Sequence, residues 1–284
     1  MNVELRHLRA LVAVVDAGTF TDAAAELQVS QAAVSRSVAA LEQTLGLRVL
    51  DRNTRHVALT ARGTQVLASA RRILDEVAHL QRLAQQTRTE LRVGYAWAAL
   101  GRHTRRLQRA WTGVPLVFVQ TNTVTAGLSE GTADVAVVRR ALSDPRFGTA
   151  LIGTEGRCAA IATDNPLARR RTVRVEDVAR YTVAIDDRTG TTTLDLWDPG
   201  PGPAAVRATH GVDEWLTLIA AGQAVGITSE ATAHQNPRPG VAYRMLRHAP
   251  RIEVRLAWWR DDPPAGLAEL IRLSRAAYGS SARP

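Results

Sequence analysis

The sequence predicts an α/β chain with a helical N-terminal part and a C-terminal part in which strands and helices alternate. Three observations predict this. Up to about residue 45, apolar residues recur at three- and four-residue spacing, the period of helices that bury one face. The same period runs from Thr60 to about Arg88, which predicts one long helix. From residue 90, short apolar runs alternate with helical segments, which favours a parallel sheet.

The N-terminal part opens with three expected helices, each with a start or stop signal. Leu5, Leu8, Val12 and Val15 share one face of the first helix, over residues 4–17, and Gly18 ends it. Hydroxyl side chains start the other two helices, because they cap free N–H groups. Thr19 or Thr21 is expected to cap the second helix. Ser30 is expected to cap the third, which runs from Gln31 to about Leu45 and stops at Gly46.

The third helix has a buried apolar face and an opposite face suited to the major groove of DNA. Gln and Arg side chains form paired hydrogen bonds with base edges, Ser forms adaptable ones, and Ala allows close approach. The residues that we predict to contact DNA here are Ser30, Gln31, Ala33, Ser35, Arg36 and Ser37.

A hairpin is expected to follow this helix. Residues 47–50 and 56–59 have strand composition, and residues 51–55 form the tip between them. Arg52 and Arg55 would give the tip two cations for phosphates or the minor groove. Three helices and such a hairpin make a winged helix-turn-helix. The pattern alone also fits a small helical bundle with a solvated polar face.

The segment from Phe20 to Glu42 resembles the DNA-binding signature of the LysR-type transcriptional regulators. The likeness continues over 45–52 and 59–63, so it spans about 45 residues without an insertion or deletion. Ala32 and Leu50 depart from the common proline and phenylalanine. The resemblance implies that Gln31, Ser35 and Arg36 meet the major groove of a double-stranded operator, and that Arg52 and Arg55 make the wing contacts.

The long helix from Thr60 carries an apolar seam at heptad spacing, suited to pairing with another helix. The seam comprises Val66, Ala70, Ile73, Val77, Leu80 and Ala84. We therefore predict self-association, although a helix packed on its own domain fits as well. The family resemblance implies dimers that can pair into tetramers, and RNA polymerase as a further partner.

Beyond residue 90, two blocks of alternating strands and helices suggest two subdomains with a cleft between them. The expected strands are 91–95, 116–120, 134–138, 158–162, 181–185, 225–228 and 252–259, and the expected helices are 98–111, 125–130, 212–222 and 267–278. Looser likenesses over 128–137, 165–168 and 219–227 make this region similar to the family's regulatory domain, which resembles periplasmic binding proteins. By that likeness subdomain 1 holds about 90–158 and 257–284, and subdomain 2 about 159–256.

Ligands of open α/β sheets bind beyond the carboxyl ends of the strands. This rule, with the resemblance, predicts a small-molecule effector between the subdomains. The predicted contacts are Tyr95, Trp97, Ala98, Ala99, Thr123, Arg139, Thr189, Asp213 and Thr228. Relatives often bind an acid through Ser or Thr in the first loop, and Ala98 and Ala99 put that mode in doubt here. For each residue a packing role is an equal alternative.

Charge and composition narrow the function classes. The net charge of +9 is carried by arginine alone, and residues 1–90 contribute only +2, so DNA binding is inferred from placement and not from bulk charge. Without lysine, Schiff-base and phosphate-loop enzymes are excluded, and a lone Cys158 excludes a paired-cysteine sensor. We expect no enzyme activity, no cofactor or metal, no membrane association and a cytoplasmic location. A solute-binding protein is the remaining rival, disfavoured because the sequence shows no export signal.

Overall fold

The computed structural model describes residues 2–51, 57–83 and 89–279. The chain divides into two compact units, one of residues 1–86 with 129–131, the other of residues 87–128 with 132–284. In the described part of the chain, none of the helices combines the length and the apolar composition needed to cross a membrane.

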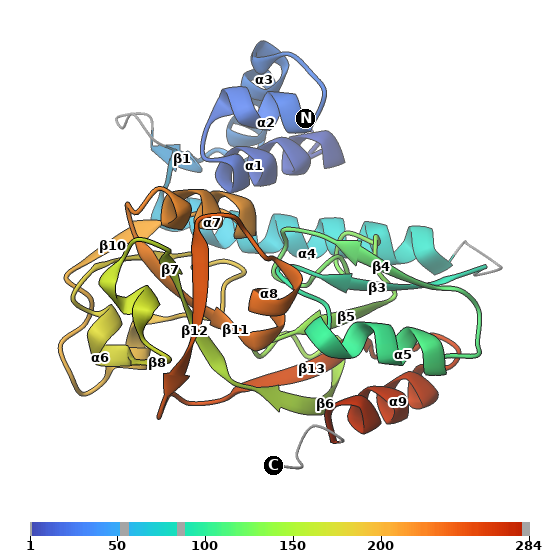
Figure 1. The fold of residues 1–284 in the computed structure, drawn as a ribbon. Helices are drawn as coiled ribbons and strands as arrows, with labels where there is room; N and C mark the ends of the chain where they lie inside the picture. Colours follow the sequence, from blue (N-terminus) through green and yellow to red (C-terminus); the bar gives the residue numbers. More distant parts are fainter. Residues whose placement is uncertain (1, 52–56, 84–88, 280–284) are drawn as a thin grey trace. The chain divides into compact units, whose positions relative to one another are not determined.

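The first unit, here called the head, is a three-helix cluster followed by a hairpin and a long helix (Figure 1). Leu11, Val14, Val34, Val38 and Leu41 form the centre of its apolar core. The elements of the head are α1 (Leu5–Ala17), α2 (Phe20–Glu26), α3 (Gln31–Leu45), β1 (Leu50–Asp51), β2 (Ala58–Leu59) and α4 (Ala61–Leu83).

The helix boundaries of the head follow from local capping. Thr19 Oγ1 accepts a hydrogen bond from Asp22 N, and Ser30 Oγ accepts one from Ala33 N, so each hydroxyl satisfies one free N–H of the helix that it starts. Gly18 and Gly46 end α1 and α3 in the left-handed conformation, with φ of 77° and 65°. The expected third helix is confirmed residue for residue, and Thr19 caps the second.

The hairpin is shorter than expected. Leu50 pairs with Leu59 and Asp51 with Ala58 in an antiparallel ladder. Arg52 and Arg55, the predicted wing residues, lie outside the described residues. The shortening has a physical reason, because the N–H groups of Val49 and Leu50 turn to a side chain of α3 instead of to a strand.

Helix α4 starts at a hydroxyl cap, since Thr60 Oγ1 accepts from Gly63 N at 2.8 Å. The predicted seam divides between two environments. Ala70 is buried, and Val66 packs against the head's core. Ile73 and Leu80 remain 46% and 67% exposed in the single chain. The first residues of the seam therefore pack in the core of the head, and later ones leave apolar side chains exposed.

The second unit, here called the regulatory domain, contains two sheets. One has the strand order β4-β3-β5-β13-β6, and the other β10-β9-β11-β7-β12-β8. Strands β3, β4 and β5 run parallel in the first sheet, and β9, β10 and β11 in the second. The strands are β3 (Leu91–Tyr95), β4 (Leu116–Gln120), β5 (Val135–Val138), β6 (Phe147–Glu155), β7 (Arg157–Ala162), β8 (Thr172–Arg174), β9 (Thr182–Ile185), β10 (Ala205–Ala208), β11 (Val225–Ser229), β12 (Val241–Arg247) and β13 (Ile252–Trp259).

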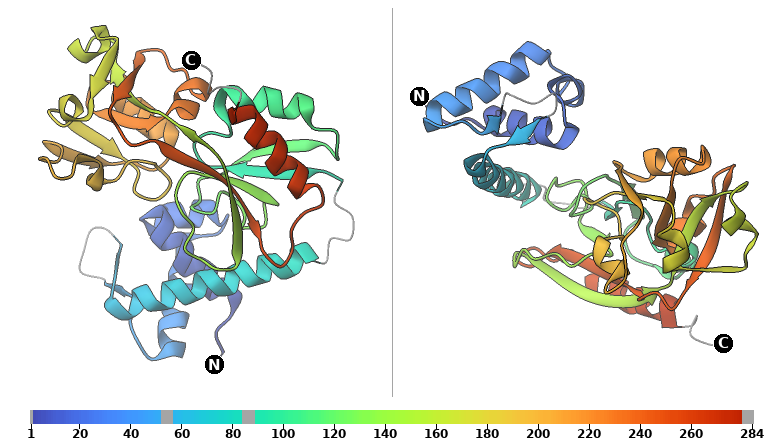
Figure 2. Two further views of the ribbon diagram at one scale, coloured as in Figure 1. Left: turned by 90° about the horizontal axis from the view of Figure 1, so that it is seen from below. Right: turned by 90° about the vertical axis from the view of Figure 1, so that its left-hand side faces the viewer.

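Short helices cover these sheets, and α5 and α9 lie side by side against the five-stranded one (Figures 1 and 2). The helices and 3₁₀ turns are η1 (Gly101–His103), α5 (Thr104–Ala110), η2 (Pro166–Arg169), α6 (Val175–Val178), η3 (Leu194–Trp197), α7 (Val212–Ala220), α8 (Glu230–Gln235) and α9 (Leu267–Gly279).

Three expectations for this unit need correction. Residues 98–100 are not helical, because the helical segment begins only at Gly101, whose positive φ of 54° sets a turn there. Residues 125–130 form turns and no helix, with positive φ at Ala126 and Gly127. The chain crosses into the second sheet at Gly156 and returns before Ile252. Residues 157–158 therefore belong to subdomain 2, and residues 252–256 to subdomain 1.

Candidate functional site

The outer face of α3 presents the residues predicted to read DNA. Gln31, Ser35 and Arg36 are exposed, while Ala33 and Ser37 are half-buried beside them. The hydroxyl of Ser30 serves as the helix cap, so its role is to fix the start of the reading face. Val34, Val38 and Leu41 are buried on the opposite side. The helix thus separates a packing face from a face free to approach base edges.

Sequence reasoning missed the basic side chains of α1 that share a groove with α3. A hollow of about 560 Å³ is lined by Arg6 and Arg9 of α1 and by Arg36 of α3, among others. Arg6 also pairs with Glu4 at 2.9 Å on the exposed surface. Three guanidinium groups around one groove suit a phosphate backbone next to the reading face. The sequence feature that could have indicated these residues is the spacing of Arg6 and Arg9, which lie one helical turn apart on α1.

Glu42 is a second residue of the head whose contacts the sequence pattern did not reveal. Its side chain is buried, and Oε1 accepts hydrogen bonds from Val49 N at 2.8 Å and Leu50 N at 3.3 Å. The carboxylate therefore connects the start of the hairpin to the last turn of α3.

In the regulatory domain, loops that follow the carboxyl ends of parallel strands in the two sheets contact each other. Trp97 follows β3, and its Nε1 donates to Thr189 Oγ1, after β9, at 2.9 Å. Asn122 follows β4, and its side-chain oxygen lies 3.2 Å from the same hydroxyl. Arg140 follows β5 and donates to the carbonyl oxygen of Asp187. The two subdomains therefore touch directly at the predicted effector position, here called the junction.

Trp97 fills the middle of the junction. It is 7% exposed, and its ring meets that of Trp215 edge to face, with centroids 5.1 Å apart. Of the nine predicted effector contacts, the structure brings Trp97 and Thr189 into direct contact across the junction, and Arg139 into contact with Ala98 and Ala99.

Arg139, another predicted effector contact, lies in a buried ion pair. Its buried guanidinium pairs with Glu155 of β6 and donates to the carbonyl oxygens of Ala98 and Ala99 at 2.6 and 2.5 Å. Tyr278 O–H donates to Glu155 as well, at 2.5 Å. Burial by itself raises the pKa of Glu155, but the charge and hydrogen bonds of Arg139, with Tyr278, outweigh burial and hold the pKa below its ordinary value. This network fixes the backbone that carries Trp97.

The other predicted contacts have local partners. Tyr95 packs against the core of subdomain 1. Thr123 Oγ1 accepts from Gly127 N at 3.0 Å. Asp213 is exposed and pairs with Arg238 at 3.3 Å, and Thr228 is buried within β11.

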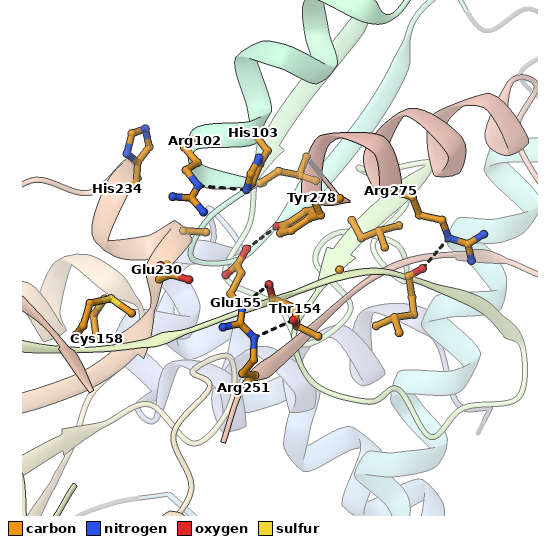
Figure 3. A pocket seen from close by; sticks show the side chains of 17 residues that line it. Arg102, His103, Thr154, Glu155, Cys158, Glu230, His234, Arg251, Arg275 and Tyr278 are labelled. Carbon is orange, nitrogen blue, oxygen red and sulfur yellow. Dashed lines mark hydrogen bonds between the residues drawn. The ribbon is translucent and has the colours of Figure 1, made fainter. Parts of the chain in front are cut away.

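A cavity of about 580 Å³ lies where the chain crosses between the two sheets (Figure 3). Arg102, Arg251 and Arg275 contribute cations to its lining, and Glu155 and Glu230 contribute carboxylates. Cys158 also lines it; burial raises the pKa of its thiol to about 12, so the thiol stays protonated and is a poor nucleophile. No residue pattern pointed to this cavity, because its lining comes from six separate segments of the sequence.

Comparison with known proteins places both units in one family. A family model described as "Bacterial regulatory helix-turn-helix protein, lysR family" matches residues 5–64, and one described as "LysR substrate binding domain" matches residues 84–279. The chain is 37% identical over 207 residues to the uncharacterized HTH-type transcriptional regulator YnfL of Escherichia coli, covering 69% of this chain and 70% of that one. It is 28% identical over 248 residues to the HTH-type transcriptional regulator BenM of Acinetobacter baylyi, covering 81% of both.

Solved structures agree on the fold. Full-length CbnR in complex with its target DNA matches with a TM-score of 0.56 at 24% identity, covering 97% of this chain and 99% of that one. A full-length BenM variant matches with a TM-score of 0.55 at 23% identity, covering 99% and 98%.

Proposed function

The chain belongs to the LysR family of bacterial transcriptional regulators, and from this membership we propose how its own residues carry out regulation. The head reads an operator through α3, with Gln31, Ser35 and Arg36 against base edges. Arg6 and Arg9 hold the adjacent phosphates. The regulatory domain takes a small-molecule effector at the junction.

The exposed reading face of α3 is the observation that supports this proposal most. A helix whose cap, stop and buried face are all satisfied internally leaves its polar face with no structural task. Arginine and glutamine on such a face match the hydrogen-bonding edges of guanine and adenine. CbnR, which shares the fold, has been solved on its target DNA, and this favours the same use of the head here.

We propose a homodimer that can pair into a tetramer, formed along α4. Ile73 and Leu80 are large apolar residues that stay largely exposed in one chain, and water contact with them is unfavourable. A second α4 at heptad register would cover them. A dimer of heads would then read two half-sites separated by one helical turn of DNA or a multiple of it.

An effector would act by changing the junction. Because Trp97 and Thr189 join the two subdomains, a ligand that inserts between them alters how the subdomains meet. We propose that this change is passed to the heads, and that RNA polymerase is the partner that responds to it. Regulation of this kind needs no catalysis, metal or prosthetic group, and we propose a cytoplasmic location, because the target DNA of a bacterial regulator lies there.

Selection of binding sites from a random duplex pool, with the full chain at fixed salt, tests the proposal. We expect enrichment of an inverted repeat whose halves lie about 10 base pairs, or a multiple, apart. Enrichment of isolated half-sites would contradict the dimer, and the absence of any enriched sequence would contradict α3 as a reading helix.

A further inference from the structure

Asp186 lies at the carboxyl end of β9, inside the junction, and is only 3% exposed. Its carboxylate accepts four hydrogen bonds. Oδ1 accepts from Arg188 N at 2.9 Å and Thr189 N at 3.0 Å. Oδ2 accepts from Thr189 Oγ1 at 2.8 Å and from Gly211 N at 2.7 Å. Gly211 precedes α7, so the carboxylate also meets the positive end of a nine-residue helix.

These donors are the kind that hold a carboxylic acid ligand. Backbone N–H groups at strand ends and at a helix start, together with one hydroxyl, favour an anion without any cationic side chain. Burial by itself raises the pKa of Asp186, but the bonds from Thr189, Gly211 and Arg188 outweigh it and keep the pKa below its ordinary value. The side chain is thus charged over the physiological range and fully hydrogen-bonded.

The carboxylate is also linked to the opposite subdomain. Thr189 has one hydroxyl proton, and the 2.8 Å contact directs it to Asp186. The oxygen of the same hydroxyl accepts the indole N–H of Trp97 at 2.9 Å. Asp186 therefore bonds to the backbone of subdomain 2 and, through Thr189, holds Trp97 of subdomain 1. A bound acid that bridged the two subdomains would make the same set of bonds.

In subdomain 1, two backbone N–H groups after β3 also have hydrogen-bond acceptors within the protein. Ala99 N donates to Gln235 Oε1 at 3.0 Å, and Leu100 N donates to Thr104 Oγ1 at 3.1 Å. Two N–H groups after β3 that could otherwise receive an acid, those of Ala99 and Leu100, are therefore satisfied by side chains of the protein itself.

One polar group at this edge is still available. Thr209 follows β10, and its backbone N–H bonds to Ile185, the residue before Asp186. Its side-chain hydroxyl is buried and has no hydrogen-bond partner within the described part of the chain. A buried hydroxyl can donate to or accept from an uncharged polar group.

We propose that Asp186 is a built-in carboxylate that occupies the anion position of the junction, so that the effector is an uncharged or cationic molecule and not a carboxylic acid. This rests on the proposed effector role of the junction. A second carboxylate there would face a buried like charge, and the N–H groups of Arg188, Thr189 and Gly211 are already bonded to Asp186. Asp186 is in this sense the residue that sets the chemical class of the effector.

Acetate tests this directly, because it is the side chain of Asp186 with one hydrogen added. Asp186→Gly removes that group and leaves a space of the size of acetate, lined by the hydrogen-bond donors that Asp186 had used. We expect the variant to melt at a lower temperature than the wild type. We also expect acetate, at about ten times its Kd, to raise the Tm by roughly 3–5 °C beyond equal ionic strength of chloride. Asp186→Asn keeps the volume filled and should show no acetate-specific rise.

A second variant, tested with a second anion, covers the case in which the glycine variant does not fold. Asp186→Ala keeps the Cβ atom and should be stabilised specifically by formate. The wild type should respond to acetate and formate no more than to chloride. The proposal is overturned if folded Gly and Ala variants show no anion-specific rise, or if the wild type shows a rise as large as theirs. These assays use the full chain without DNA, so failure here is distinct from failure to bind an operator.

Discussion

Replacing Glu42 should destabilise the head more than any other single polar change in α3. In Glu42→Ala two buried N–H groups, of Val49 and Leu50, lose their acceptor. A hydrogen bond to a carboxylate contributes about 1.5–3 kcal/mol, and a stranded buried N–H costs about 1–3 kcal/mol. Because the second contact is long, at 3.3 Å, we expect a total loss of about 2–4 kcal/mol in the free energy of unfolding of the head.

Glu42→Gln is the matched control, since the amide oxygen keeps the shape and can still accept. Its loss should be about 1 kcal/mol, the difference between charged and neutral acceptors. All six tryptophans lie beyond residue 90, so tryptophan fluorescence reports the regulatory domain alone. Helical circular dichroism reports both units.

Urea unfolding followed by both signals therefore separates the two units. We expect Glu42→Ala to move the dichroism transition of the head to lower urea while the fluorescence transition stays in place. A change below about 0.5 kcal/mol, within the range of ordinary surface substitutions, would refute the reasoning that this carboxylate holds the hairpin to α3.

Three further predictions concern α4 and the regulatory domain. Ile73→Asp should shift sedimentation from dimer to monomer, whereas Gln65→Asp, an exposed change on the same helix, should not; an unchanged dimer in Ile73→Asp would refute pairing along α4. Burial and a neighbouring arginine lower the pKa of His103, so the folded chain takes up fewer protons than the unfolded chain, and stability should fall as pH drops below about 6.5. His103→Gln should flatten that dependence in urea titrations at pH 5.5 and 7.5, and an unaltered slope would contradict it. Trp97→Phe and Thr189→Val should each lower regulatory-domain stability by about 0.5–1.5 kcal/mol, and fully additive losses in the double variant would show that their hydrogen bond is not formed.

The sequence predicted best what local chemistry decides. Ser30 and Gly46 bound α3 because a hydroxyl cap and a left-handed glycine act within a single helical turn. The positions of Trp97 and Thr189 after strand ends also followed, because the carboxyl ends of parallel strands lie at one edge of their sheet. Their contact across the two sheets did not follow from the sequence. Gly101 shows the limit of such reasoning. A Cβ there would meet the backbone of Ala231 at 2.6 Å, and the sequence pattern does not reveal this long-range packing at the point where the helical segment begins.

Side-chain roles set by distant partners could not be predicted. Arg139 follows a strand, as effector residues do, yet Glu155 of a strand that the pattern missed draws it into a buried ion pair. Strand β6 escaped notice because its residues alternate irregularly between buried and exposed positions. The hydrogen bonds of Asp186 could not be predicted either, since three of its four donors are backbone groups that leave no sequence pattern.

The measurement that tests the central claim most directly is operator affinity of Arg36→Ala at one fixed salt concentration. The central claim is that the exposed face of α3 reads DNA sequence. We expect a loss of about 1–3 kcal/mol, roughly 5- to 150-fold in Kd, together with relaxed discrimination at one base pair of each half-site. Arg72→Ala, an exposed arginine on α4, should change affinity less than about twofold. Unchanged operator affinity and unchanged base discrimination in Arg36→Ala would contradict the claim.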